Sequence, residues 1–197
     1  MKTKFDTREE WLHAAIKQLK RELFKQYKIP AVKVSVGLPY GRGSKKAIGQ
    51  HWHPAASDDK VGSIFISPTV DDDRAVLGIL IHELIHAIAG NEAGHGKEFR
   101  KIAIGVGLVG RMVSTTPGKE LTKKIKKLIR KIGPYPHAKL NLNKGPIKKQ
   151  STRMVKVECL DCGYIVRTSR KNIEERGPTL CPCNHKPMWY FSLRGYE

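Results

Sequence analysis

Residues 82–86 read His-Glu-Leu-Ile-His, a pattern that could bind a metal ion and use it for hydrolysis. Residues four apart lie on one face of a helix, so the imidazoles of His82 and His86 can reach the same ion. Glu83 can reach a water on that ion, act as general base and pass the proton to a leaving amine. Zinc would supply a hydroxide-like nucleophile at neutral pH and polarise the scissile carbonyl. The pattern therefore predicts a peptidase with one catalytic zinc.

The alternative is a buried helix that contains two histidines and a glutamate by chance. The residues around the motif, from 75 to 88, are apolar on nearly every side of the expected helix. Burying three ionisable groups without partners is costly, and a metal ion in a hydrated cleft removes that cost. We therefore favour the metal site.

A catalytic zinc needs a third protein ligand and an open fourth position. The spacing in which Gly and His follow the second His by three and six residues is absent, because those positions hold Ala and Glu. His95 lies nine residues after His86, and glycines on both sides allow its backbone to approach a metal closely. We prefer His95 as the third ligand, with Glu92 as the second candidate and Glu98 also competing.

The four cysteines are clustered in the last part of the chain, as Cys159-x-x-Cys162 and Cys181-x-Cys183. Four thiolates in two such pairs predict one closed, structural zinc site. The segment 153–197 has too little core to fold alone, and a metal would supply the missing stability. The second pair is tighter than the usual C-x-x-C of zinc ribbons, which leaves the fourth ligand open between Cys183 and His185.

Apolar spacing and cap residues predict the elements that must position these groups. We expect helices over 8–27, from an Asp71–Asp73 cap to Ala89, over 96–104 and over 119–132. Strands are expected over 32–36, 46–52 and 62–67, with strand-like stretches at 154–157 and 164–166. His51, Trp52 and His53 are interpreted as a strand end with mixed packing roles. The order of elements predicts an α+β domain over 1–135, a basic linker over 136–152 and a zinc-ribbon module over 153–197.

No apolar h-region follows Met1, and no run of 18 apolar residues exists, so we expect no signal peptide and no membrane span. Clustered cysteines without an export signal indicate metal binding in a reducing compartment. The expected location is the cytoplasm, in association with the nucleoid if the protein binds DNA, and the protein is not expected to be secreted.

The chain is strongly basic, with 37 Lys and Arg against 18 Asp and Glu, a formal charge of +19 and a pI near 9.9. Between residues 111 and 150, twelve residues are basic and one, Glu120, is acidic. Such an excess favours a polyanionic partner, and we expect DNA binding without sequence specificity. The alternatives are a merely solvated helix face, or a membrane surface, which the lack of aromatic residues on helix 119–132 disfavours. The candidate DNA-contacting residues lie on that helix: Lys123, Lys124, Lys127, Arg130 and Lys131.

The motif resembles the SprT-like metallopeptidases, which include the Spartan proteases that degrade proteins crosslinked to DNA. The resemblance is carried by His82-Glu83-Leu-Ile-His86 together with the later Gly94-His95-Gly96-x-x-Phe99, and extends to residues 133–137 and to the cysteine segment. It implies a zincin-like fold of helices with a small, mostly antiparallel sheet, followed by a zinc ribbon. It also implies the same three zinc ligands, Glu83 as catalyst, and proteolysis near DNA.

The means of binding a protein substrate is less determined by the sequence. The strand around Ile64-Phe65-Ile66 could pair its edge with an extended peptide, or be an ordinary core strand. Tyr135 or His137 could donate a hydrogen bond to an oxyanion, or serve structure alone. A second hypothesis for the chain is a non-catalytic DNA-binding or transcription-associated zinc protein. A third is metal-dependent hydrolysis of a substrate other than protein. The oligomeric state is not indicated.

Overall fold

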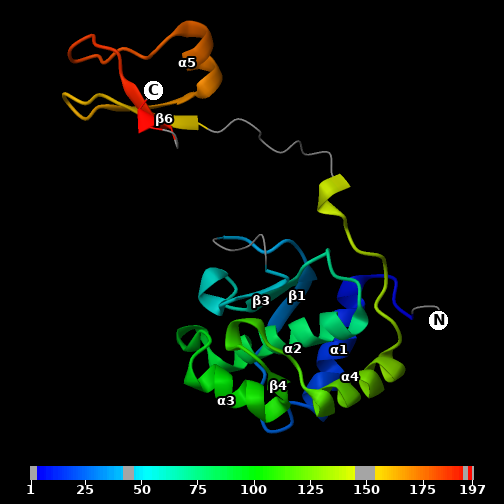
Figure 1. Ribbon diagram of the computed structural model, residues 1–197. Coiled ribbons are helices and arrows are strands. Elements are labelled where there is room, and N and C mark those ends of the chain that lie inside the picture. The colour runs from blue at the N-terminus through cyan, green and yellow to red at the C-terminus, as the bar shows by residue number, and fades with distance from the viewer. Residues whose placement is uncertain (1–3, 42–46, 145–153, 193–194, 197) are drawn as a thin grey trace. The chain divides into compact units, whose positions relative to one another are not determined.

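The computed structural model describes residues 4–41, 47–144, 154–192 and 195–196 (Figure 1). The chain divides into two compact units, Met1–Asn143 and Lys144–Glu197. Parts of three predicted segments lie outside the described residues: the linker from 145 to 152, the first residue of strand 46–52, and residues 153, 193–194 and 197 of the C-terminal module. Among the described residues, no helix is both long enough and apolar enough to cross a membrane.

The described residues of the first unit form four α-helices, a three-stranded sheet and a two-stranded ladder, which confirms the α+β class. The helices are α1 (Arg8–Glu22), α2 (Asp73–Ala89), α3 (Lys97–Val106) and α4 (Lys119–Ile132). The strands of the sheet are β1 (Val32–Val36), β2 (Gly49–Trp52) and β3 (Gly62–Ile66). The ladder pairs β4 (Leu108–Val109) with β5 (Thr116–Pro117).

The sheet has the order β1-β3-β2, so β3 is central and β2 is an edge strand. The three-stranded sheet is mixed rather than mostly antiparallel as predicted, because β1 runs parallel to β3 and β2 runs antiparallel to it. The suggestion that β3 pairs with a peptide is also wrong, because strands already occupy both of its edges. The strand next to the central helix α2 that has a free edge among the described elements is β2.

Helix α2 passes through the middle of the unit, with β2 and β3 packed against it on one side and α3 and α4 on another (Figure 1). The Asp72 side chain accepts a hydrogen bond from the amide of Ala75 at 2.8 Å and caps the helix. Gly90, with φ of 86°, ends it. Eight of its 17 residues are buried, namely Val76, Leu77, Ile79, Leu80, Ile81, Glu83, Leu84 and Ile85. The predicted bounds of α2 and α4 are confirmed.

Helix α1 begins with the predicted capping box, in which Thr7 and Glu10 satisfy each other's backbone amides. It ends at Glu22 rather than at the predicted Tyr27. The amides of Leu23 and Phe24 both donate to the carbonyl of Leu19, at 2.8 and 2.9 Å, and the chain then turns. Phe24 is fully buried, so the apolar spacing beyond Glu22 reflects the packing of this turn.

Residues 136–140, which the sequence assigned to the linker, are fastened to the first unit by Arg8. This side chain is 8% exposed. Its guanidinium donates to the carbonyls of Ala138 at 2.6 Å and of Pro136 and Pro68 at 3.4 Å. The amide of Leu140 also donates to the carbonyl of Pro68, at 2.8 Å. Arg8 therefore joins α1, the end of β3 and the segment after α4.

The second unit is a small antiparallel sheet of order β7-β6-β8-β9. Its elements are β6 (Met154–Glu158), β7 (Ile165–Ser169), α5 (Arg170–Arg176), β8 (Trp189–Ser192) and β9 (Gly195–Tyr196). The described core is limited to Val157, Cys159, Cys181 and Met188, with three partly buried neighbours. So small a core contributes little stability by itself, which agrees with a module that needs a further cross-link.

Replacement of Arg8 by Ala is expected to lower the free energy of unfolding of the first unit by about 2–3 kcal/mol, because three carbonyls lose a charged donor. Urea unfolding followed by circular dichroism measures the change. Arg21→Ala, at an exposed position of the same helix, is the control and should stay within about 0.5 kcal/mol of the wild type. Equal losses in the two variants would contradict the clamping role of Arg8.

Candidate metal centre

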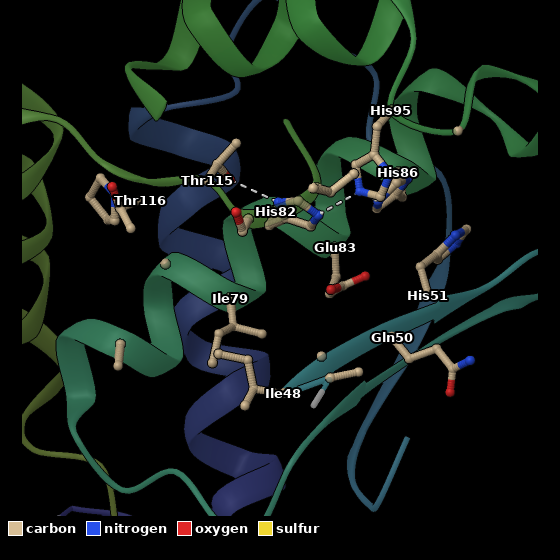
Figure 2. Close-up of a pocket in the computed structure, with 18 of the residues that line it drawn as sticks. Ile48, Gln50, His51, Ile79, His82, Glu83, His86, His95, Thr115 and Thr116 are labelled. Atoms are coloured by element: carbon tan, nitrogen blue, oxygen red, sulfur yellow. Dashed lines mark hydrogen bonds between the residues drawn. The ribbon is translucent and has the colours of Figure 1, made fainter. Parts of the chain in front are cut away.

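The structure brings His82, His86 and His95 together at one point (Figure 2). His82 and His86 are one turn apart on α2, and His95 comes from the loop that leads into α3. The Nε2 atom of His95 lies 3.2 Å from the Nε2 atom of His82 and 3.2 Å from that of His86. Three imidazole nitrogens thus face one another across a gap of atomic size.

This donor set fits a zinc ion. With Zn–N bonds of 2.0–2.1 Å, two ligands of a tetrahedral site are separated by about 3.3–3.4 Å, close to the observed spacing. Burial, with a contribution from the neighbouring imidazoles, lowers the pKa of His82 to about 4 and that of His86 to about 3. Burial also lowers the pKa of His95. All three rings are therefore neutral at pH 7, the form that ligates metals.

Thr115 fixes the orientation of His82. Its Oγ1 atom lies 2.8 Å from Nδ1 of His82, so a ring whose Nε2 ligates a metal would donate its Nδ1–H to Thr115. The β4–β5 ladder closes the loop that contains Thr115 and carries it over α2. Thr115 was not predicted from the sequence, since neither spacing nor residue type connects it to His82.

The ring of Phe99 packs against all three imidazoles. Its ring is fully buried in α3, and its centroid lies 4.9 Å from that of His82, 4.5 Å from that of His86 and 5.0 Å from that of His95. Contacts of this kind restrict the rotamers of the histidines without competing for their nitrogens. The phenylalanine in the motif on which the resemblance rests thus has a physical role.

Glu83 lies beside the histidines and is 6% exposed. Burial raises the pKa of its carboxyl group to about 8, and a hydrogen bond from the backbone of His51 acts in the opposite direction. Strand β2 can approach so closely because residue 49 is glycine. A Cβ atom there would lie 2.6 Å from Oε1 of Glu83 and 2.4 Å from Cγ2 of Ile79. Gly49 was not predicted from the sequence, although a glycine inside a strand pattern can signal a close backbone approach.

A cleft of about 730 Å³ opens over these groups (Figure 2). Its floor is one face of α2, and its walls are residues 47–51 along β2 and residues 113–117. The clustered histidines and Glu83 all line it. The cleft is large enough to admit part of a polypeptide chain.

The other ligand and oxyanion candidates lie elsewhere. The side chains of Glu92 and Glu98 are exposed and do not belong to the three-histidine cluster. Tyr135 is buried against Trp11, with ring centroids 4.9 Å apart, and His137 donates from Nε2 to the carbonyl of Asp6 at 2.9 Å. Neither Tyr135 nor His137 lines the cleft, so both oxyanion suggestions are wrong.

In the second unit, three of the four cysteines converge. The sulfur atoms of Cys159, Cys162 and Cys181 lie within 4.8 Å of one another, and none of the cysteines forms a disulfide. The sulfur–sulfur separation in a tetrahedral zinc–thiolate site is about 3.8 Å. Hydrogen bonds from the backbone of Cys162, and then of Asp161, lower the pKa of Cys159 to about 7, which favours the thiolate. The group has the chemistry of a structural zinc site.

Among the described residues, the Cys183 side chain forms a hydrogen bond with Cys162 but does not join the group of three sulfur atoms that lie within 4.8 Å of one another. Cys183 is exposed, and its amide donates to the sulfur of Cys181 at 3.4 Å. The amide of His185 donates to the carbonyl of Cys181 at 2.8 Å, and His185 has a positive φ of 55°. Both candidates thus lie on the turn that follows Cys181.

The predicted DNA-contacting residues share one face of α4. They are all exposed, whereas the opposite face of the helix is buried through Leu121, Ile125, Leu128 and Ile132. Lys123 forms an ion pair with Glu120 at 2.7 Å, and Lys131 forms one with Glu22 of α1. Lys124, Lys127 and Arg130 complete this basic face.

The fold and the site together define an α+β protein with a three-histidine cluster and an adjacent glutamate in a cleft. A family model described as the SprT-like family matches residues 12–124, more than half of the chain. The chain belongs to the SprT-like family. No curated protein and no solved structure matches the sequence. The matched region contains the histidines and ends before the second unit.

We expect two equivalents of zinc per chain, one lost on His95→Ala and the other on Cys181→Ser, because each change removes a converging ligand atom. Elemental analysis of dialysed protein measures the zinc content. His13→Ala, at an exposed position of α1, is the control and should keep both ions. Full zinc content in the His95 variant would rule out His95 as a ligand.

Proposed function

We propose that the chain is a zinc-dependent endopeptidase in which Glu83 is the general base. The observation that carries the proposal is the convergence of three neutral imidazoles and a carboxyl group at one end of a large cleft. Membership of the SprT-like family supports it. His82, His86 and His95 would hold the zinc ion. When bound, the ion would acidify a water molecule and polarise the scissile carbonyl.

The residues of the chain would move the protons. Glu83 acts in its ionised form, which a bound zinc cation would favour by lowering the raised pKa of this carboxyl group. It takes a proton from the attacking water and passes it to the nitrogen of the leaving amine. The backbone of His51 holds the carboxylate by a hydrogen bond, and Gly49 leaves the space for it. Thr115 keeps the imidazole of His82 turned toward the centre. These contacts fix the geometry before a substrate arrives, which lowers the cost of reaching the transition state.

The edge of β2 supports a path for the peptide. The carbonyl of Ile48 accepts a hydrogen bond from the amide of Ser67. Because ladder bonds alternate along a strand, the backbone amides and carbonyls of Gly49 and His51 point away from β3. An extended peptide could add to this edge as a further strand. The amide of His51 donates to Glu83, so the peptide would pair with the remaining backbone groups of this edge and lie directly beside the carboxylate.

We further propose that the substrates are proteins bound or crosslinked to DNA. The exposed basic face of α4 and the formal charge of +19 favour attraction to phosphates. The described side chains of that face are suited to phosphate contacts rather than to hydrogen bonds with base edges. DNA binding should therefore weaken with salt and not depend on base sequence. The non-catalytic zinc protein is the competing function, because it shares the metal sites and the charge.

Glu83→Gln is expected to lower proteolysis of a DNA-binding protein by about 10²–10⁴-fold, because the amide cannot accept the proton. Zinc-loaded wild type and variant are incubated with the substrate, with and without single-stranded DNA, and the fragments are quantified on gels. Zinc content and DNA affinity should stay at the wild-type level. If the wild type binds zinc and DNA but cleaves nothing, the non-catalytic function replaces the peptidase.

Gly49→Ala is expected to lower kcat by about 10²-fold while zinc remains bound, because the new methyl group displaces Glu83 from its place beside β2. Gly105→Ala in α3 is the matched control, since its Cβ would meet only the Tyr27 hydroxyl, at 3.2 Å. Steady-state kinetics on a fluorogenic peptide compares the two variants. Equal kcat values would show that the close approach of β2 has no role in catalysis.

A further inference from the structure

The cleft continues well beyond the metal centre, along the N-terminal half of α2. Ile79 lies one turn before Glu83 on the same helix face, and Ala75 lies one further turn away. At 1.5 Å per residue, these steps are about 6 Å each. An extended peptide covers about 3.3 Å per residue, so its side chains two to four residues from the reacting bond would reach this end.

The two ends of the cleft differ in chemistry. The titratable groups among its described lining residues gather at one end: His51, His82, Glu83, His86 and His95. The other end is lined mainly by small or apolar residues, namely Ala47, Ile48, Ala75, Gly78, Ile79 and Pro117, with the uncharged Thr116 next to Pro117. In a chain with a formal charge of +19, no lysine or arginine is among the described residues that line the cleft. Phosphates and charged side chains would lose hydration there and gain no charged partner among these described residues.

Two glycines give this apolar end its shape. A Cβ on Gly78 would lie 3.2 Å from Cγ of Pro117, so glycine allows the wall at β5 to approach the helix. In the same way, the absence of a side chain at Gly49 allows β2 to pack closely against Ile79. Ile48 lies at the rim and is 48% exposed. The apolar surface is therefore accessible from the cleft and set by backbone positions rather than by flexible side chains.

We propose that the apolar end is a specificity subsite that receives one uncharged, apolar side chain of the polypeptide substrate, of the size of Leu or Met. The inference rests on the proposed peptidase function and identifies what that site selects. The occupant belongs to the same polypeptide that lies across Glu83, because the cleft is continuous from the metal centre to Ile48. A peptide side chain fits this end better than nucleic acid does, since phosphates would find no cation among the described residues that line it.

The test uses zinc-loaded full-length protein and fluorogenic peptides that differ at a single position. Leu, Lys and Asp are placed in turn at each of four positions on either side of the cleaved bond. At one position, Leu is expected to give a kcat/KM about 10–100-fold above that of Lys or Asp, the range typical of a hydrophobic pocket.

Ile48→Asp should reverse this selectivity, lowering kcat/KM for the Leu peptide and raising it for the Lys peptide by about 10-fold each. Ile104→Asp is the matched control. Ile104 is 53% exposed on α3 and does not line the cleft, so its variant should keep the wild-type preference. Comparable zinc content and thermal stability in the two variants would exclude a folding effect.

The outcomes separate the two proposals. The subsite is overturned and the peptidase remains if the wild type cleaves the peptides without preference or prefers a charged residue throughout. The same holds if Ile48→Asp and Ile104→Asp change the peptide preference equally. If zinc-loaded wild type cleaves no peptide or protein, the peptidase function is overturned, and the subsite falls with it.

Discussion

The packing of α2 is the constraint on which the rest of the structure depends. Its side chains contact β2, β3, α3 and α4, and the residues facing them are apolar and buried. Only one face remains open, and it carries the two histidines and Glu83 as well as Ile79 and Ala75. Because the helix is held from every other side, these groups cannot move away from one another to regain hydration. The low pKa values of His82 and His86 and the high pKa of Glu83 are consequences of that confinement.

The features predicted from the sequence are those set by short-range spacing. The capping box of α1, the Asp72 cap and the Gly90 stop of α2, and the bounds of α4 all follow from residues a few positions apart. His95 belongs with them, because a glycine stop and a short loop leave it little freedom to be elsewhere. The helix α5 escaped prediction, since Ile173 is its single apolar residue and the pattern has almost no period.

The features that the sequence could not supply depend on contacts between distant segments. Alternation shows which side chains of a strand face the core, but not which strand is its neighbour. Thus β1 and β2 follow one another along the chain, yet both pair with β3, and β2 becomes the edge beside Glu83. Gly49 and Thr115 acquire their roles only through this arrangement. The local sequence around a glycine in a strand or a threonine in a loop does not indicate which distant residues it will contact.

The charge distribution lets recognition and cleavage use separate surfaces. The basic face of α4 is exposed and dense in cations, whereas the described lining of the cleft contains neither lysine nor arginine. On the proposed function, DNA would hold substrate proteins near the enzyme through long-range attraction, which raises their effective concentration. The cleft then needs only a modest preference for an apolar side chain, because binding to DNA has already selected the proteins that reach the enzyme. A charged cleft would instead compete with α4 for DNA and fill the peptide site with the polyanion that delivers the substrate.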